Sequence, residues 1–317
     1  MMRALIALLA VALPFAAAAK DVVRVVDSQA IVFDAYALHI AKEEGYFDAE
    51  NLDVSIIVGR GGSDSLQAII TGSQDIIYGT GILAVISAAA KGAPVVILAN
   101  SELGSPEIYW FVKSDSPIKT FRDLDGGHDF IYSTPGSVTH LISQTIAKEL
   151  GIKPKFVSAG ASTASRTQMM SGQIETAWGT FPNNLDLMRS GQIRQIGTGA
   201  DSKTISMTST RVTAANTDWL AKNRDAAVRF MRALWKGEEY MFSNPSAIQR
   251  FGKYWNVAPE DANQALDYFK LERHRFAPIG NVDGLLKMAQ EYGFLKEPVT
   301  PEQAKKMIDI VYEGPKK

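Results

Sequence analysis

Residues 34–99 read DAYALHIAKEEGYFDAENLDVSIIVGRGGSDSLQAIITGSQDIIYGTGILAVISAAAKGAPVVILA, and this stretch decides the fold. The spacing of Ala35, Leu38 and Ala41 predicts a helix that ends at Gly45. Alternating apolar residues at 54–58 predict a strand that ends in the glycine loop at 59–62. A helix over about 65–71, a strand at 75–79, a helix through Ala90 and a strand at 95–100 follow in the same way. This alternation predicts a parallel sheet with right-handed crossovers.

Two of these strands run through small residues into the start of a helix. The first turn contains Gly61, Gly62 and Ser63, and the second contains Thr80 and Gly81. Such turns leave backbone N–H groups unpaired, and in an open α/β sheet they line a shared crevice where ligands bind. Neither turn has GxGxxG or GxxxxGK[ST] spacing, which argues against dinucleotide and nucleoside-triphosphate binding.

The motifs AKEEGYF at 41–47, NLDV at 51–54, LQAIITGSQDIIYGTG at 66–81 and KGAPVVILA at 91–99 resemble a known family. It comprises the periplasmic solute-binding proteins of the nitrate/sulfonate/taurine and thiamine-pyrimidine group, which capture ligands for ABC importers. The resemblance covers nearly all of the chain after the N-terminal segment. It implies an α/β type II periplasmic binding protein fold, with two doubly wound lobes joined by a two-strand hinge. It also implies a monomer without enzymatic activity or cofactors, which partners a small-molecule solute and ABC permease subunits.

The N-terminal segment MMRALIALLAVALPFAAAAKD predicts a cleavable secretory signal peptide at 1–19. Arg3 precedes an apolar run, Pro14 breaks the run, and residues 17–19 give an A-x-A cleavage site. A membrane anchor is the alternative, but the run is shorter than the ~20 residues that a spanning helix needs. We therefore expect a periplasmic protein.

The composition excludes several classes of function. The chain has 317 residues, which suggests two compact lobes, and its net charge of −1 gives no reason to expect nucleic-acid binding. It contains no cysteine, so disulfides, thiolate metal sites and cysteine nucleophiles are absent. The histidines at 39, 128, 140 and 274 lack HExxH-like spacing, which argues against a zinc site.

We expect the chain to form lobe I over 20–110, lobe II over 111–207, and a return to lobe I with C-terminal helices over 208–317. The first hinge is expected near residues 109–113, and residues 301–313 are expected to form the last helix. In lobe II, Gly136, Ser137 and Thr139 precede or begin a helix that Gly151 ends. The resemblance implies that these three residues contact ligand, whereas an ordinary N-cap is the alternative. His140 is expected to be a solvated or core residue.

Further candidates lie at the ends of predicted strands. Ser28 and Gln29 follow the strand at 22–27, and Gln29 offers both a donor and an acceptor, with a solvated loop as the alternative. Phe33 would stack on a flat ligand or fill the core. Arg60 would pair with a sulfonate or carboxylate, or it would be a surface charge.

The region around residues 173–182 also matches the family. Trp178 is expected to form a stacking wall or to donate its indole N–H, with structural packing as the alternative. Thr180 follows Trp178 and is a further candidate. Phe181 departs from the family pattern, because an acidic residue or another aromatic often precedes the proline there. Arg211 lies near the return crossing and is expected on the surface, with a contact to the ligand as the alternative.

These features lead to the hypothesis of an extracytoplasmic binding protein that captures a small organic anion by hinge closure. A sulfonate or carboxylate, with or without an aromatic body, suits the helix N-termini and hydroxyl groups. The alternative is a binding protein for a neutral pyrimidine or thiamine precursor. A same-fold pyrimidine-synthesis enzyme and a ligand-sensing domain are two further alternatives.

Overall fold

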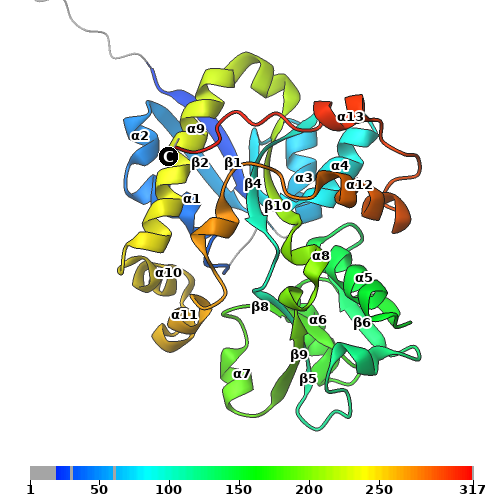
Figure 1. Ribbon diagram of the computed structural model, residues 1–317. Helices are drawn as coiled ribbons and strands as arrows, with labels where there is room; N and C mark the ends of the chain where they lie inside the picture. The colour runs from blue at the N-terminus through cyan, green and yellow to red at the C-terminus, as the bar shows by residue number, and fades with distance from the viewer. Residues whose placement is uncertain (1–18, 29–30, 60–61, 316–317) are drawn as a thin grey trace, which may run out of the picture.

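The computed structural model describes residues 19–28, 31–59 and 62–315. These residues form two α/β lobes, one above the other in Figure 1. The fold class expected from the sequence is therefore confirmed. The predicted signal peptide falls almost entirely on residues 1–18, which lie outside the described residues.

The first lobe is built on a five-stranded sheet with the order β2-β1-β3-β10-β4. Its strands are β1 (Asp21–Asp27), β2 (Leu52–Val58), β3 (Ile76–Gly81), β4 (Val95–Leu103) and β10 (Ser209–Asn216). The strand β1 pairs in parallel with β2 and β3, as the sequence predicts. The expectation of an all-parallel sheet is wrong, however, because β10 lies antiparallel between β3 and β4. It returns from the far end of the second lobe, so the local alternation of elements contains no sign of it.

Helices cover both faces of this sheet (Figure 1). On one face, α1, α2, α9 and α10 share a hydrophobic core with β1 and β2, and on the other face α3, α4 and α12 pack. The helices of this lobe are α1 (Tyr36–Glu43), α2 (Tyr46–Ala49), α3 (Gly62–Ile70), α4 (Ile82–Ala90), α9 (Thr217–Ser243), α10 (Ala247–Trp255), α11 (Pro259–Ala265), η3 (Leu271–His274), α12 (Val282–Glu291) and α13 (Pro301–Lys306). The turn at Gly45 has a φ of 71°, as the predicted helix end requires.

The second lobe contains a three-stranded sheet of order β8-β5-β9 and a parallel pair β6-β7. Its strands are β5 (Ile108–Lys113), β6 (Asp129–Tyr132), β7 (Lys155–Ser158), β8 (Ala177–Thr180) and β9 (Ile193–Thr198). Its helices are η1 (Phe121–Leu124), α5 (Val138–Leu150), α6 (Ser162–Met170), α7 (Leu185–Arg189), η2 (Gly199–Asp201) and α8 (Lys203–Ser206). Residues 109–113, where the first hinge was expected, belong to β5 in the middle of the sheet. The lobe boundaries at 110/111 and 207/208 stay predictions.

Two segments connect the lobes, one between β4 and β5 and one between β9 and β10. They are hydrogen-bonded to each other where they leave the first lobe. The backbone N–H of Gly104 donates to the carbonyl of Thr208 at 2.9 Å, and the hydroxyls of Ser105 and Thr210 lie 2.8 Å apart. Movement of one lobe relative to the other must therefore pass through this paired strip.

The C-terminal segment closes the edge of the first sheet. The predicted helix at 301–313 ends at Lys306, and Ile308 then forms a bridge with Ile97 of β4. The N–H of Ile97 donates to Met307, and its carbonyl accepts from Asp309. The helix is shorter than expected because Met307 and Asp309 form hydrogen bonds with the backbone of the edge strand β4 instead of continuing the helix.

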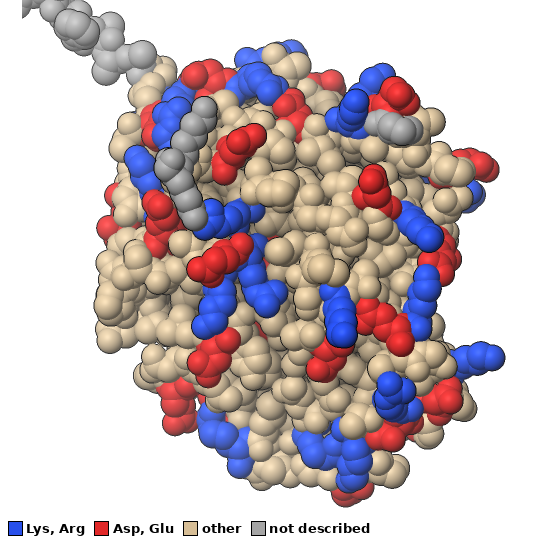
Figure 2. All heavy atoms as spheres, viewed as in Figure 1, with Lys and Arg blue, Asp and Glu red and all other residues tan. Residues whose placement is uncertain are grey.

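None of the helices in the described ranges combines the length and apolar character needed to cross a bilayer. Figure 2 shows acidic and basic side chains interspersed over the visible face, in keeping with the net charge of −1.

Candidate ligand-binding site

A cavity of about 470 Å³ lies between the two lobes, and residues of both lobes line it. Gly81 at the end of β3 faces the start of α5 across the cavity. A Cβ atom added at Gly81 would lie 3.3 Å from Val138 Cγ2 and 3.8 Å from the carbonyl oxygen of Gly136. Two of the glycine corners singled out in the sequence, one from each lobe, therefore meet at this cavity.

Four helices begin at the cavity wall. The helix α3 begins at Gly62, and the N-caps of α4, α5 and α6 are Gly81, Ser137 and Ala161, all of which line the cavity. Each helix N-terminus carries a partial positive charge of about half an elementary charge and has free N–H donors. The cavity is thus an environment that favours negative charge.

The start of α5 is the most fully described of these corners. The Ser137 hydroxyl accepts from the N–H of His140 at 3.2 Å, which is the N-cap role expected from the sequence. Thr139 Oγ1 lies 3.0 Å from the Ser137 hydroxyl and accepts from the N–H of Ser133 at 2.9 Å. In contrast, the N–H groups of Val138 and Thr139 have no acceptor among the described residues. These two donors are available to a ligand.

His140 is a core residue that supports this corner. Its ring stacks on Tyr132 with a centroid separation of 3.9 Å, and its Nδ1 accepts from the N–H of Gly136 at 3.3 Å. Burial lowers the pKa of His140 to about 4, so the imidazole is neutral at pH 7. A neutral ring is what the accepting Nδ1 requires.

Most of the residues predicted to contact ligand lie at the cavity. The predicted residues that line it are Ser28, Gly62, Gly81, Gly136, Ser137, Thr139, Trp178 and Thr180. Gln29, Arg60 and Gly61 lie outside the described residues. Ser63 lies in the first turn of α3, which begins at Gly62 and therefore earlier than the helix predicted over about 65–71.

Two other predicted residues lie behind the cavity. Phe33 is fully buried in the core, where its ring packs 5.5 Å from the rings of Phe251 and Phe269. It fills the core, the second of the two roles considered for it. Thr80 is also fully buried, and its Oγ1, which lies next to Gly62, has no hydrogen-bond partner among the described residues.

Trp178 lines the cavity with its indole donor already engaged. Its Nε1–H donates to the carbonyl of Gly160 at 3.1 Å, so the expected donor role towards ligand is filled by the protein. The ring itself is left as a wall of the cavity. Tyr109 and Trp110, on the neighbouring strand β5, are fully buried.

Two arginines, Arg166 and Arg211, line the cavity although the sequence did not predict them there. Arg166 on α6 was not singled out, although it lies one turn after the small-residue corner at 160–162, which is the available signal. Its Nη1 donates to Asn184 Oδ1 at 2.5 Å, and Asn184 in turn donates to the Tyr109 hydroxyl at 3.0 Å. Arg166 has no carboxylate partner among the described residues. Its charge is therefore available to a ligand.

Arg211 was expected on the surface, and this expectation is wrong. It lines the cavity from β10 with only 4% of its surface exposed, and it forms ion pairs with Glu102 and Glu107. Arg211 Nη1 lies 2.6 Å from Glu107 Oε1. Burial opposes the charge of Arg211, but the two carboxylates outweigh it and raise the pKa of the guanidinium. Its positive charge is already matched within the protein.

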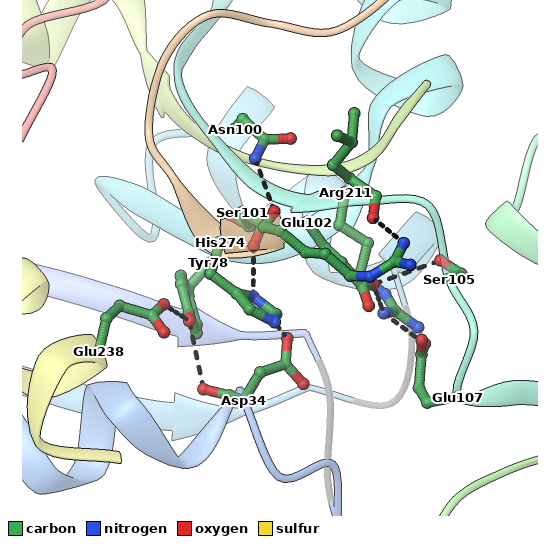
Figure 3. A network of polar contacts seen from close by, with 12 residues as sticks. Asp34, Tyr78, Asn100, Ser101, Glu102, Ser105, Glu107, Arg211, Glu238 and His274 are labelled. Atoms are coloured by element: carbon green, nitrogen blue, oxygen red, sulfur yellow. Dashed lines mark hydrogen bonds and ion pairs between the residues drawn. The ribbon is translucent and has the colours of Figure 1, made fainter. Parts of the chain in front are cut away.

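A larger polar network extends behind Arg211 (Figure 3). Burial raises the pKa of Glu102 well above its usual range, although Arg211 acts in the opposite direction. Burial likewise raises the pKa of Asp34 to about 6. With several carboxyl groups around one guanidinium, part of the network must carry protons to stay near neutral.

The inner end of this network contains His274 and a Tyr78–Glu238 pair (Figure 3). His274 Nδ1 donates to the carbonyl of Ser101 at 2.8 Å, and burial lowers its pKa to about 4. The Tyr78 hydroxyl donates to Glu238, and burial raises the pKa of that carboxyl well above its usual range. No group of three or more His, Asp or Glu residues in the described part of the chain is arranged to hold a metal ion.

The two lobes, the hinge of two segments and the cavity between them define a periplasmic binding protein fold, and comparison with solved structures agrees. The alkanesulfonate-binding protein SsuA from Xanthomonas axonopodis pv. citri, solved bound to MOPS, aligns with a TM-score of 0.75 at 16% identity, over 93% of this chain and all of that chain. The nitrate-binding protein NrtA from Synechocystis PCC 6803 aligns with a TM-score of 0.69 at 15% identity, over 91% and 86% of the two chains.

The profile of the family described as NMT1/THI5 like matches residues 33–248, and the chain belongs to this family. This confirms the resemblance noted from the sequence. A curated relative is the 4-amino-5-hydroxymethyl-2-methylpyrimidine phosphate synthase THI13 of Saccharomyces cerevisiae. The two are 23% identical over 253 residues, which cover 74% of this chain and 71% of the yeast protein.

Proposed function

We propose that this protein is the extracytoplasmic solute-binding component of an ABC importer, and that its ligand is a small organic anion. The ligand class is a sulfonate or carboxylate, with or without an aromatic body. The main support is the convergence of four helix N-termini on one cavity between the lobes.

The second support is the unequal state of the two cavity arginines. Arg211 is already paired with Glu102 and Glu107, whereas Arg166 has no carboxylate partner among the described residues. A guanidinium of this kind binds a sulfonate or carboxylate through two parallel hydrogen bonds. We therefore assign the anionic group of the ligand to Arg166 and the start of α5, and its apolar body to the ring of Trp178.

Closure of the lobes supplies the binding mechanism. The ligand contacts α3 and α4 on one side and α5 and α6 on the other only when the lobes approach, so binding shifts the population towards the closed form. Gly81 and Val138 are already close in this structure. Ligand release then requires this contact to open at the permease.

A binding protein for a neutral pyrimidine is the second candidate, and the yeast synthase relative is the observation that favours it. A same-fold synthase is the corresponding enzymatic alternative, and a ligand-sensing domain is the least supported. The choice among them depends on the cavity, and a lining arginine without a carboxylate partner favours an anion.

The decisive experiment is a thermal-shift and calorimetric panel of alkanesulfonates, aromatic carboxylates, nitrate and 4-amino-5-hydroxymethyl-2-methylpyrimidine. We expect a sulfonate or carboxylate to stabilise the protein by about 2.7 kcal/mol at a hundredfold excess over Kd. Arg166→Ala should weaken that ligand by roughly ten- to a hundredfold, which is the effect of losing a charge-assisted hydrogen bond.

The matched control is Arg122→Ala, which removes an exposed arginine of η1 in the same lobe and should leave Kd unchanged. Selective binding of the pyrimidine, with Arg166→Ala indistinguishable from the wild type, would replace the anion proposal with the second candidate. Sequencing the N-terminus of protein recovered from cells tests the compartment, because export predicts removal of residues 1–19.

A further inference from the structure

A second cavity, of about 340 Å³, lies in the first lobe beside the two connecting segments. Its wall includes Leu103, the last residue of β4, and Ser206 and Met207, which directly precede β10. The rest of the wall comes from Asn100 of β4 and from the segment 272–280, which begins within η3. None of its lining residues also lines the cavity between the lobes. It is therefore separate from the site described above.

The charged residues of this cavity are Arg273, Arg275 and Glu272. Neither arginine has a carboxylate partner among the described residues, and Glu272 forms no ion pair there either. Arg273 Nη1 donates to the carbonyl of Leu103 at 3.2 Å, which fixes the guanidinium at the wall. The lining thus carries a net positive charge that the protein itself leaves unmatched.

Asn100 adds a buried polar atom without a partner. Only 3% of its surface is exposed, and its Nδ2 donates to the carbonyl oxygens of Arg273 and Arg275 at 3.2 and 2.8 Å. These two bonds fix the orientation of the side-chain amide, so Oδ1 is the atom that has no partner in the described part of the chain. A buried acceptor without a donor is costly, and the cavity that Asn100 lines is where a donor can enter.

We propose that this cavity is a second ligand site that takes inorganic phosphate. Phosphate supplies both features that the wall requires. Its anionic oxygens suit the Arg273–Arg275 pair, since arginine forks match phosphate geometry. Its remaining P–O–H group near neutral pH donates to Asn100 Oδ1. Sulfate has the same shape but no such proton, so it leaves that acceptor unmatched.

The position of the site gives it a consequence for the hinge. A Cβ atom added at Gly104, just after β4, would lie 2.7 Å from Arg273 Nη1 and 3.5 Å from Cα of Ser206. Arg273 therefore lies against Gly104 of the first connecting segment, and Gly104 in turn lies close to Ser206 of the second. An anion on Arg273 changes the contact on which the movement of the lobes depends, so the site is placed to act as an effector site.

The test uses Arg166→Ala protein, in which the cavity between the lobes has lost its unmatched cation. Calorimetry compares inorganic phosphate, glycerol 3-phosphate and sulfate at constant ionic strength. We expect phosphate to bind at least tenfold more tightly than sulfate. It should also bind more tightly than glycerol 3-phosphate, whose phosphate group is mostly without a proton near neutral pH. Adding Arg275→Ala should weaken phosphate binding about tenfold or more, whereas adding the exposed-site control Arg122→Ala should not.

The proposal is overturned if phosphate does not bind to Arg166→Ala protein, if sulfate binds as tightly as phosphate, or if Arg275→Ala leaves phosphate affinity unchanged. Arg275 is exposed, so its replacement should leave the fold intact, and an unchanged melting temperature verifies this. The result can be separated from the ligand proposed for the cavity between the lobes, because Arg166→Ala weakens anion binding there and Arg275 lines only the second cavity.

Discussion

Replacing Arg211 by methionine tests whether the buried ion-pair cluster holds the first lobe together at the hinge. The substitution keeps most of the side-chain volume and removes the only guanidinium that pairs with Glu102 and Glu107 among the described residues. Both carboxyl groups are fully buried, and two of their four oxygens, Glu102 Oε1 and Glu107 Oε2, have no hydrogen-bond partner among the described residues even with Arg211 present. The variant therefore leaves two carboxyl groups in a low-dielectric region without a counter-charge.

The expected loss is about 3–5 kcal/mol of unfolding free energy at pH 7, the usual cost of removing one partner from a buried ion pair. Protonation limits the loss, because burial already raises the pKa of Glu102. The penalty should therefore shrink as the pH is lowered from about 8 to about 5, since the stranded carboxyl groups then take up protons. Adding Glu102→Gln and Glu107→Gln should restore most of the lost stability.

The assay is urea unfolding followed by circular dichroism, with Arg224→Met as the matched control. Arg224 also pairs with a carboxylate, Asp309, but both side chains are more than a third exposed. Its loss should cost less than about 1 kcal/mol. The reasoning fails if Arg211→Met unfolds within 1 kcal/mol of the control, or if the triple variant is no more stable than the single one.

Four further predictions concern other parts of the first lobe. Gly237→Ala places a Cβ 2.3 Å from the carbonyl oxygen of Ala37, so it should cost about 1–3 kcal/mol in urea unfolding. His274 has a folded pKa of about 4 against an ordinary 6.5, so acidification through this range should remove about 3 kcal/mol, and His274→Gln should flatten that part of the stability–pH curve. Asp34 affects the pH dependence in the opposite direction. Because its pKa is raised to about 6, its protonation on acidification stabilises the folded state, so Asp34→Asn should steepen the loss of unfolding free energy at acid pH. Gly81→Val should block closure at the α5 contact and weaken ligand at least tenfold in calorimetry without lowering the melting temperature of the free protein, and unchanged affinity would contradict this.

Local features of the fold were predictable because their causes are local. Gly45 and Gly151 both adopt positive φ and end helices, as their positions after apolar helical patterns indicate. The corners at Gly62, Gly81 and Ser137 were likewise recognised from small residues between a strand and a helix. Five predicted residues that line the cavity lie at these corners: Gly62, Gly81, Gly136, Ser137 and Thr139.

The features that the sequence concealed depend on contacts between distant segments. Strand β10 enters the first sheet after the whole second lobe, so no pattern within residues 34–99 signals it. The burial of Arg211 follows from that insertion, because Glu102 and Glu107 lie over a hundred positions earlier. From the sequence alone, an arginine in a Thr-rich segment such as Arg211 is predicted to lie on the surface, because its carboxylate partners are distant in the chain.

The distribution of charge around the cavity follows from the same insertion. If Arg211 were unpaired, two guanidiniums and four helix N-termini would face a ligand carrying a single negative charge, and the closed empty form would be strained by repulsion. Glu102 and Glu107 cancel one of these charges within the first lobe, on the side where the hinge begins. The remaining unmatched cation, Arg166, belongs to the second lobe. Under the proposed function, a single anion neutralises Arg166 beside the start of α5, while the rest of the ligand meets the N-termini of α3 and α4 in the first lobe. This favours the closed form only when ligand is present.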